Sequence, residues 1–251
     1  METQIKEELK KIEELEDVKI IMAIESGSRA WGFASPDSDY DVRFIYVRNK
    51  VDYLRLDKVR DVIEWRLDDV LDISGWDIRK ALELLYKSNP TLFEWCASPI
   101  IYKETEEAQW LKDILPHYFS RKKSLYHYLH MATTNYHTYL TGEEVRLKKY
   151  FYVLRPVLAA QWILDKQCAP PMLFDTLVGA ELEEAMKPVI SRLLAIKKNT
   201  SEMGKAPRLT EVNEYLDRKM VEIRRAAEAV EDSRREWDEI NQLFLKILGN
   251  R

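Results

Sequence analysis

The order of apolar and polar residues predicts an N-terminal helix followed by a small sheet. The first apolar residues recur at steps of four and three, the spacing of one helical face; they are Ile5, Leu9, Ile12 and Leu15. Residues 18–24 and 42–47 are short β-branched runs, which favour buried strands. A third apolar segment covers residues 59–65. We therefore expect a helix that leads into at least two strands.

Helical spacing takes over after Gly75. Residues 78–86 have apolar positions separated by three or four, which predicts an amphipathic helix. This helix should end near Asn89, because Pro90 disfavours helical geometry in the residue before it. From about Thr105 onward strand signals nearly vanish and helical ones dominate.

Two apolar stripes in the second half of the chain each predict a long helix. They comprise Leu147, Phe151, Leu154 and Leu158, and then Val212, Leu216, Met220, Ile223, Ala227 and Val230. The polar residues 197–207 between them predict a mobile connection. We therefore expect an α+β fold, with a small mixed β-sheet domain and its helices at residues 1–104, followed by an all-helical domain at residues 105–251.

Composition and charge restrict the possible functions. The 251 residues are 46% hydrophobic, which is enough to build a sizeable core. The formal net charge is -4, so a global basic field does not attract nucleic acid, and any site for a polyanion must be local. The first residues are too charged for a signal peptide, and no apolar run approaches the roughly 18 residues that span a bilayer. We expect a cytoplasmic protein that does not bind membranes.

The stretch between the first two predicted strands combines a small turn with two carboxylates. Gly27 lacks the Cβ that would keep a phosphate away from the backbone amides of Gly27 and Ser28. Asp39 and Asp41 are two residues apart at the start of a strand, so their side chains point to the same face. Tyr40 between them points the other way. The stretch therefore predicts a phosphate site beside carboxylates that share divalent metal ions.

A third acidic residue on a neighbouring strand would complete a site for two metal ions that activate an attacking hydroxyl and neutralise a triphosphate. Asp72 has the apolar flanks expected of such a residue. Glu64 is the alternative, because residues 62–65 also fit a strand. The sequence leaves the choice between Asp72 and Glu64 open.

The spacing of these motifs resembles the signature of the nucleotidyltransferase superfamily typified by DNA polymerase beta. Gly27-Ser28 is followed by ten residues and then by Asp39-Tyr40-Asp41. Three longer stretches are similar, more narrowly, to a bacterial and phage family of predicted nucleotidyltransferases linked by inference to RNA repair; they are residues 27–47, 72–95 and 148–163. The resemblance implies a small mixed sheet with helices on one face, followed by a helical domain that closes over the nucleotide.

Basic residues in both halves are candidates for binding the phosphates of a nucleotide. Arg29 directly follows the Gly-Ser turn and can reach a phosphate, although a surface salt bridge is the alternative. In the helical half, Lys148, Tyr152 and Arg155 lie at i, i+4 and i+7 and so share one face, which is either a phosphate contact or an ordinary solvated surface. Lys149 points about a hundred degrees away from Lys148, so only one of these two lysines should face the phosphates.

Two aromatic features carry an interpretation of their own. Trp31 and Phe33, which follow the Gly-Ser turn, are interpreted as anchors of the core or of a loop rather than as residues that stack on bases. Residues 121–130 (RKKSLYHYLH) form the only stretch in which basic and aromatic residues alternate as they do in an RNA-binding groove, and they fit a helix exterior equally well.

These observations predict a nucleotidyltransferase that depends on Mg²⁺, or on Mn²⁺ in its place. Asp39 and Asp41 would bind metal, and Asp72 would bind metal while helping to deprotonate the acceptor hydroxyl. The donor would be a nucleoside triphosphate and pyrophosphate would leave. The sequence does not decide whether the acceptor is an RNA end, a protein side chain or a small molecule. The alternative from another functional class is a catalytically silent, antitoxin-like binding module.

Overall fold

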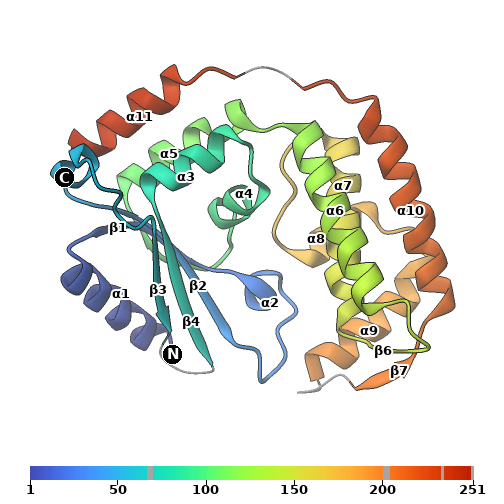
Figure 1. Cartoon of the computed structure of the whole chain (residues 1–251). Coiled ribbons are helices and arrows are strands. Elements are labelled where there is room, and N and C mark those ends of the chain that lie inside the picture. The colour runs from blue at the N-terminus through green and yellow to red at the C-terminus, as the bar shows by residue number, and fades with distance from the viewer. Residues whose placement is uncertain (67–69, 200–203, 233–234, 250–251) are drawn as a thin grey trace. The chain divides into compact units, whose positions relative to one another are not determined.

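Two compact units make up the chain, and Figure 1 shows the elements of both. The computed structural model describes residues 1–66, 70–199, 204–232 and 235–249. Unit 1 contains Met1–Ala30, Asp39–Tyr118 and the C-terminal helix α11 (Asp238–Gly249). Unit 2 contains Trp31–Ser38 and the chain from Phe119 through helix α10 (Thr210–Glu228).

Unit 1 is built on a five-stranded mixed sheet in the order β3-β4-β2-β1-β5. Among the described strands, β2 and β4 alone pair in parallel, and the other neighbours are antiparallel. This mixed sheet, with helices dominating the later part of the chain, confirms the expected α+β fold. The strands are β1 (Lys19–Glu25), β2 (Tyr40–Val47), β3 (Val62–Arg66), β4 (Leu71–Asp77) and β5 (Ile101–Glu104).

The helices of unit 1 follow the predicted periodicity closely. In α1, the residues Ile5, Leu9 and Ile12 are buried against the sheet, whereas Leu15, one residue before the end of the helix, is exposed. Asn89 caps the helix that Pro90 begins. The helices are α1 (Glu2–Glu16), α2 (Gly27–Ala30), the 3-10 helix η1 (Lys50–Leu54), α3 (Ile78–Tyr86), α4 (Pro90–Cys96) and α5 (Glu106–Tyr118).

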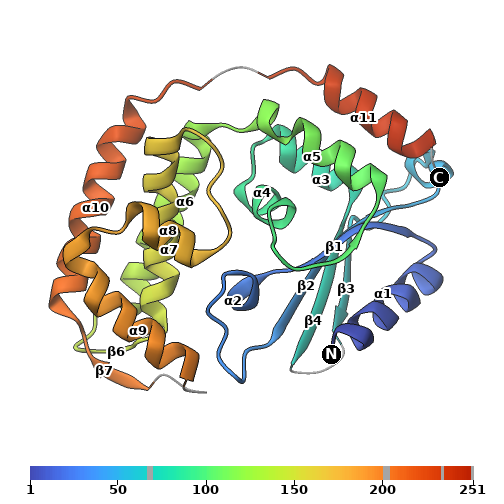
Figure 2. The ribbon, with the colours of Figure 1, turned by 180° about the vertical axis from the view of Figure 1, so that it is seen from behind.

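Unit 2 packs its helices around α7 (Figure 2). Both predicted stripes lie in its core, although Leu147 and Val230 are only partly buried at its edge. The unit also contains a two-stranded ribbon, β6–β7, that helical periodicity did not predict. Its elements before α10 are α6 (Arg121–Tyr139), β6 (Glu144–Arg146), α7 (Lys149–Lys166), α8 (Phe174–Glu181), the 3-10 helix η2 (Glu184–Met186), α9 (Lys187–Asn199) and β7 (Lys205–Pro207).

The polar residues 197–207 are not simply a mobile connection. Residues 197–199 end α9 and residues 205–207 form β7, while residues 200–203 lie outside the described part of the chain. The prediction was wrong at both ends of this stretch, because a short exposed strand and the last turn of a helix carry too few apolar residues to show a period.

The two compact units do not correspond to a single division of the chain at residue 104. Helices α5 and α11 group with the sheet rather than with the later helices. The Tyr118 hydroxyl in α5 donates a hydrogen bond to the Glu236 carbonyl at 3.0 Å, and the rings of Tyr86 and Trp237 stack with their centroids 3.7 Å apart. These contacts fix the C-terminal helix on unit 1, and the domain boundary expected from the sequence stays a prediction.

The segment Trp31–Ser38 belongs to unit 2, although it lies between the Gly-Ser turn and β2 in sequence. Phe33 is 1% exposed, and its ring lies within 5.1 Å of the Phe151 ring and 5.3 Å of the Phe174 ring, centre to centre. The Phe174 amide donates to the Trp31 carbonyl at 2.9 Å. The interpretation of Trp31 and Phe33 as core and loop anchors is therefore confirmed.

A buried carboxyl in unit 2 makes its stability depend on pH. Glu181, at the end of α8, is 9% exposed. Burial first, and then the neighbouring Asp165 carboxylate, raise the pKa of Glu181 above its ordinary value of 4.5, and Lys166 and Lys219 oppose this only in part. The folded protein therefore holds this proton more tightly than the unfolded chain does.

We expect Glu181→Gln to stabilise the protein at pH 8 but not at pH 4. A raised folded pKa gives stability that is fully present below the unfolded pKa and is lost as pH rises through the folded one. Glutamine removes the ionisation, so the free energy of unfolding in urea should rise by roughly 1 kcal/mol at pH 8, a value reduced for solvent screening. An effect of equal size at both pH values would contradict this account.

Candidate functional site

The Gly27 turn and the Asp41 carboxylate lie in direct contact. Gly27 has a φ of +59°, in the left-handed region, and a Cβ built on it would lie 2.0 Å from Asp41 Oδ2. The Ser26 amide donates to the Asp41 carbonyl at 2.8 Å. Only glycine therefore leaves room for the carboxylate, and the turn is fixed to the start of β2.

The parallel pairing of β2 and β4 places Asp41 beside Asp72. The register pairs Asp41 with Asp72 and Arg43 with Ser74, so these side chains share one face. Asp39 precedes β2 and is exposed. Burial raises the pKa of Asp41, and the charges of Asp72 and Asp39 raise it further against the opposing effect of Arg43. The structure thus brings the predicted carboxylates into electrostatic contact at one end of the two strands.

Glu64 points to the same face of the sheet as Asp41 and Asp72, but it pairs with β4 two residues beyond Asp72. In the antiparallel pair of β3 and β4 it is opposite Ser74, whereas Asp72 is opposite Arg66. Glu64 is exposed. The register therefore puts Asp72, and not Glu64, directly beside Asp41, a distinction that depends on strand pairing and that sequence spacing could not make.

Arg43 bridges the two carboxylates. Its Nη2 lies 2.8 Å from Asp72 Oδ2 and 3.3 Å from Asp41 Oδ1, and its Nη1 donates to the carbonyls of Val42 and Asp72. The side chain is 18% exposed. Arg43 thus neutralises part of the repulsion between two carboxylates that the sheet holds side by side.

Glu25 supports Asp41 from inside the sheet. It is fully buried at the end of β1, and its Oε1 accepts a hydrogen bond from the Asp41 amide at 2.8 Å. Its Oε2 accepts a hydrogen bond from the Tyr102 hydroxyl at 2.5 Å, and burial raises the pKa of the Glu25 carboxyl. Sequence reasoning missed Glu25 and Arg43; the available signal for Glu25 was a charged residue that closes an apolar strand directly before the Gly-Ser turn.

Arg29 packs on the loop that leads to the carboxylates. Its guanidinium carbon lies 3.6 Å from the centre of the Tyr40 ring, and its Nε donates to the Asp39 carbonyl at 3.1 Å. The side chain thus spans from the Gly-Ser turn, where Ser28 precedes it, to the start of β2. It places a permanent positive charge beside the turn.

The candidate residues of the helical half lie around the N-terminal half of α7 in unit 2. Lys148 is the residue before the helix, and Lys149 lies over the rings of Tyr139 and Tyr152 at 4.0 and 4.8 Å. Tyr152 is 38% exposed, whereas Arg155 is 2% exposed, with its guanidinium carbon 4.7 Å from the centre of the Trp31 ring. Arg155 is therefore part of the packed core rather than of an open face.

The three predicted carboxylates match a hard divalent cation in donor type but not in their present arrangement. Carboxylate oxygens are the ligands that Mg²⁺ and Mn²⁺ take, and Asp39, Asp41 and Asp72 supply them from adjacent positions. Within the described ranges, no three acidic, histidine or cysteine side chains converge closely enough to hold a metal ion. Arg43 instead provides the positive charge between Asp41 and Asp72.

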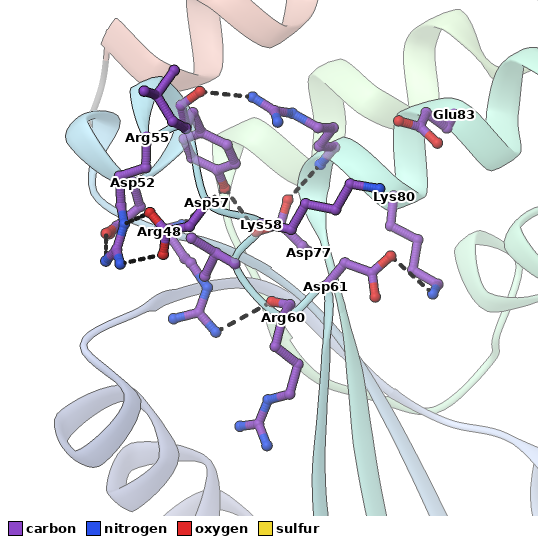
Figure 3. A pocket seen from close by; sticks show the side chains of 14 residues that line it. Arg48, Asp52, Arg55, Asp57, Lys58, Arg60, Asp61, Asp77, Lys80 and Glu83 are labelled. Atoms are coloured by element: carbon purple, nitrogen blue, oxygen red, sulfur yellow. Dashed lines mark hydrogen bonds and ion pairs between the residues drawn. The ribbon is translucent and has the colours of Figure 1, made fainter.

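A pocket of about 750 Å³ lies past the opposite end of β2 (Figure 3). Arg48 follows the last residue of β2, and the other walls come from η1, the loop after it and the start of α3. Several acidic and basic side chains of this pocket pair with one another, as Arg55 does with Asp57 at 2.6 Å and Lys80 with Asp61 at 3.1 Å. These pairings leave little net charge to attract a phosphate.

Comparison with known proteins identifies the family. A model of RlaP, the RNA repair pathway DNA polymerase beta family, matches residues 1–246. The chain belongs to this family. The resemblance noted in the sequence is thereby confirmed, and the assignment makes the protein nucleotidyltransferase-like.

Two individual proteins are similar to this member of the RlaP family. An uncharacterized protein of Bacillus subtilis (strain 168), YcgL, is 44% identical over 251 residues, which cover 99% of this chain and 96% of that protein. A crystal structure of a nucleotidyltransferase-like protein from Exiguobacterium sibiricum 255-15 is 12% identical and covers 98% of this chain and 80% of that one, with a TM-score of 0.32. Such a score carries no conclusion about the fold or the site. In the part of the RlaP chain that the structure describes, no helix combines the length and apolarity needed to cross a bilayer.

Gly27→Ala should displace the Asp41 carboxylate and destabilise the protein. The new Cβ would overlap Asp41 Oδ2, and alanine is strained at a φ of +59°. We expect the free energy of unfolding in urea to fall by about 1 to 3 kcal/mol. Gly179→Ala in α8 is the matched control, because its Cβ would meet nothing within 4 Å. It should leave stability unchanged or raise it by up to about 1 kcal/mol. A Gly27→Ala protein as stable as the control would refute the close contact.

Proposed function

We propose that this protein is a Mg²⁺-dependent nucleotidyltransferase that transfers a nucleoside monophosphate from a triphosphate to an acceptor hydroxyl. The observation that carries the proposal is the parallel register of Asp41 and Asp72 directly beside the Gly27 turn. A phosphate-binding turn and paired carboxylates are the two parts that transfer from a triphosphate requires. Membership in a DNA polymerase beta family supports the same chemistry.

Asp39, Asp41 and Asp72 are the residues that would hold Mg²⁺, with Mn²⁺ as a substitute. Bound there, the metal would neutralise charge on the triphosphate and acidify the acceptor hydroxyl. The backbone amides of Gly27 and Ser28 would donate to phosphate oxygens, and Arg29 would add its charge at the end of the turn. Arg43 would release the carboxylate oxygens that it now contacts.

The reaction itself moves one nucleotide. Asp72 would accept the proton of the acceptor hydroxyl, and the acceptor oxygen would form a bond to the α-phosphorus. The bond from that phosphorus to the bridging oxygen of the β-phosphate would break in line, and pyrophosphate would leave with the electron pair. Glu25 would keep Asp41 in place through its hydrogen bond to the Asp41 amide.

Residues around α7 would provide further contacts to the phosphates. The N-terminal end of a helix favours anions, and one of Lys148 and Lys149 would add a point charge there. Tyr152 is exposed enough to contact a nucleotide. Arg155 is buried against Trp31, so we propose that it contributes by holding Trp31 against α7.

An RNA end is the acceptor that the family description favours, because that description places the family in RNA repair. A catalytically silent module is disfavoured, since clustered carboxylates that repel one another are of no use to a protein without chemistry at that place.

Transfer of label from an α-labelled triphosphate is the direct test. The protein, a panel of RNA ends and Mg²⁺ should give a labelled acceptor and pyrophosphate, and EDTA should abolish both. Asp41→Asn should lower the rate at least about 100-fold, or about 2.7 kcal/mol in barrier height. Asp57→Asn removes an exposed carboxylate that lines the pocket past the opposite end of β2, and it should leave the rate unchanged.

A measurement of triphosphate binding distinguishes a wrong proposal from a wrong choice of acceptor. Triphosphate with Mg²⁺ should raise the melting temperature of the wild type, and Asp41→Asn should lose most of the metal-dependent increment. If triphosphate binds but no RNA, protein or small alcohol is ever labelled, the enzyme proposal is wrong and the protein is a binding module. An increment that Asp41→Asn leaves intact would remove Asp41 from the metal site.

A further inference from the structure

The β6–β7 ribbon, the start of α7 and the end of α9 lie at one end of unit 2 (Figure 1). Five basic residues belong to these elements or directly flank them, and we refer to them as the basic surface. They come from two parts of the chain about fifty residues apart. They are Arg146, Lys148, Lys149, Lys197 and Lys205.

Strand pairing places two of these charges directly opposite each other. In the antiparallel ribbon, Arg146 is the partner of Lys205, and both residues are exposed. Like charges at facing positions of an antiparallel pair destabilise it. The ribbon is only three residues long on each side, so it gains little that could offset this repulsion.

A second pair of cations is held together beside the ribbon. Lys197 Nζ donates to the Ser35 hydroxyl at 3.1 Å rather than to a carboxylate. Burial, followed by the charge of Lys148, lowers the pKa of Lys197, and the charge of Asp37 offsets this only in part. The fold therefore keeps two lysines within reach of each other's field.

The basic surface differs from other charged parts of unit 2 in having no acidic partners. Among the described residues, no carboxylate forms an ion pair with any of its five members. Elsewhere in the unit, Arg218 and Lys219 pair with Glu183 and Glu222, and Lys198, next to Lys197 in sequence, pairs with Asp175 at 3.6 Å. Even with Glu143, Glu144 and Asp37 counted against the five cations, this end of the unit has more positive than negative side chains, in a chain whose net charge is -4.

Two exposed tyrosines border the basic surface. Tyr139, at the end of α6, is 39% exposed, and Tyr152 on α7 is 38% exposed. Lys149 lies over both rings, at 4.0 and 4.8 Å from their centres. Aromatic faces interleaved with lysines are the arrangement on which successive bases of a single strand stack while the cations follow the backbone.

We propose that the basic surface binds single-stranded polynucleotide, with Arg146, Lys197 and Lys205 contacting phosphates and Tyr139 contacting a base. The proposal rests on the proposed function, because such a strand would carry the acceptor hydroxyl.

Residues 121–130, the stretch in which basic and aromatic residues alternate in the sequence, form the first turns of α6. Tyr128 there is 1% exposed and Tyr126 is 41% exposed, so the stretch is a helix with one packed and one open face, as the helix-exterior alternative expected.

Binding of a fluorescent 20-nucleotide RNA, followed by anisotropy without metal or triphosphate, tests the proposal. The double variant Arg146→Ala, Lys205→Ala changes two exposed residues and should weaken binding about tenfold at low salt. Loss of two phosphate contacts should also reduce the slope of log affinity against log salt by about 1.4, at about 0.7 per contact. Lys198→Ala is the matched control and should change neither quantity.

The contribution of the tyrosine ring to binding can be tested separately from that of the cations. Tyr139→Ala should weaken binding of the single strand at least about fivefold while leaving the salt slope unchanged, because stacking on a base releases no counterions. A duplex of the same sequence should be insensitive to this variant. Comparing single-stranded RNA with DNA of the same sequence shows whether the surface also reads the 2′-hydroxyl.

The outcomes separate this proposal from the proposed function. Equal losses in the double variant and in Lys198→Ala, or no loss in either, would overturn the basic surface even if nucleotide transfer is observed. Binding that follows the predicted pattern in a protein that transfers no nucleotide would uphold the surface and reject the enzyme. Thermal unfolding of each variant shows that a loss of binding is not a loss of fold.

Discussion

The parallel register of β2 and β4 is the constraint on which the site depends, because it holds the carboxylates of Asp41 and Asp72 side by side at one end of the sheet. Two like charges at adjacent positions repel each other, and a buried carboxylate is costly to ionise. Arg43 reduces the repulsion by bridging both carboxylates. The cost of ionising Asp72 is lowered because its side chain is 49% exposed and so keeps contact with water. Carboxylate oxygens of this kind are the donor type that hard divalent cations take.

The rest of the site follows from keeping Asp41 in position. Gly27 leaves space for the Asp41 carboxylate, and the Ser26 amide donates a hydrogen bond to the Asp41 carbonyl. The buried Glu25 carboxylate accepts a hydrogen bond from the Asp41 amide. Each contact ties the end of β1 or the turn after it to the start of β2, so the Gly27 turn and the Asp41 carboxylate are held together. In the proposed transfer reaction, a carboxylate held in this way would lose little entropy when substrate binds, and such preorganisation is a main source of rate enhancement.

The sequence predicted what short-range patterns encode. Helical periodicity located α1, α3, α7 and α10, and the spacing from Gly27 to Asp41 located the turn and the first carboxylates. The sequence could not decide between Asp72 and Glu64 as the third carboxylate. That choice depends on which residues of β2 and β4 lie side by side, and these residues are about thirty positions apart in the chain. Glu25 and Arg43 were missed, since each acts through a partner on another strand. Arg155 was expected on an open face but is buried, because the distant segment at Trp31 packs over it. The basic surface was invisible for the same reason, as cross-strand pairing joins Arg146 to Lys205.

The most direct test of the central claim is to locate the metal. Crystals grown with Mn²⁺ and a non-hydrolysable nucleoside triphosphate should show anomalous scattering from Mn²⁺ in contact with the carboxylates of Asp41 and Asp72, with Asp39 completing the site. The Arg43 guanidinium should have moved off these oxygens, and phosphate oxygens should accept hydrogen bonds from the amides of the Gly27 turn. Mn²⁺ bound elsewhere on the triphosphate, with Arg43 still bridging Asp41 and Asp72, would contradict the account.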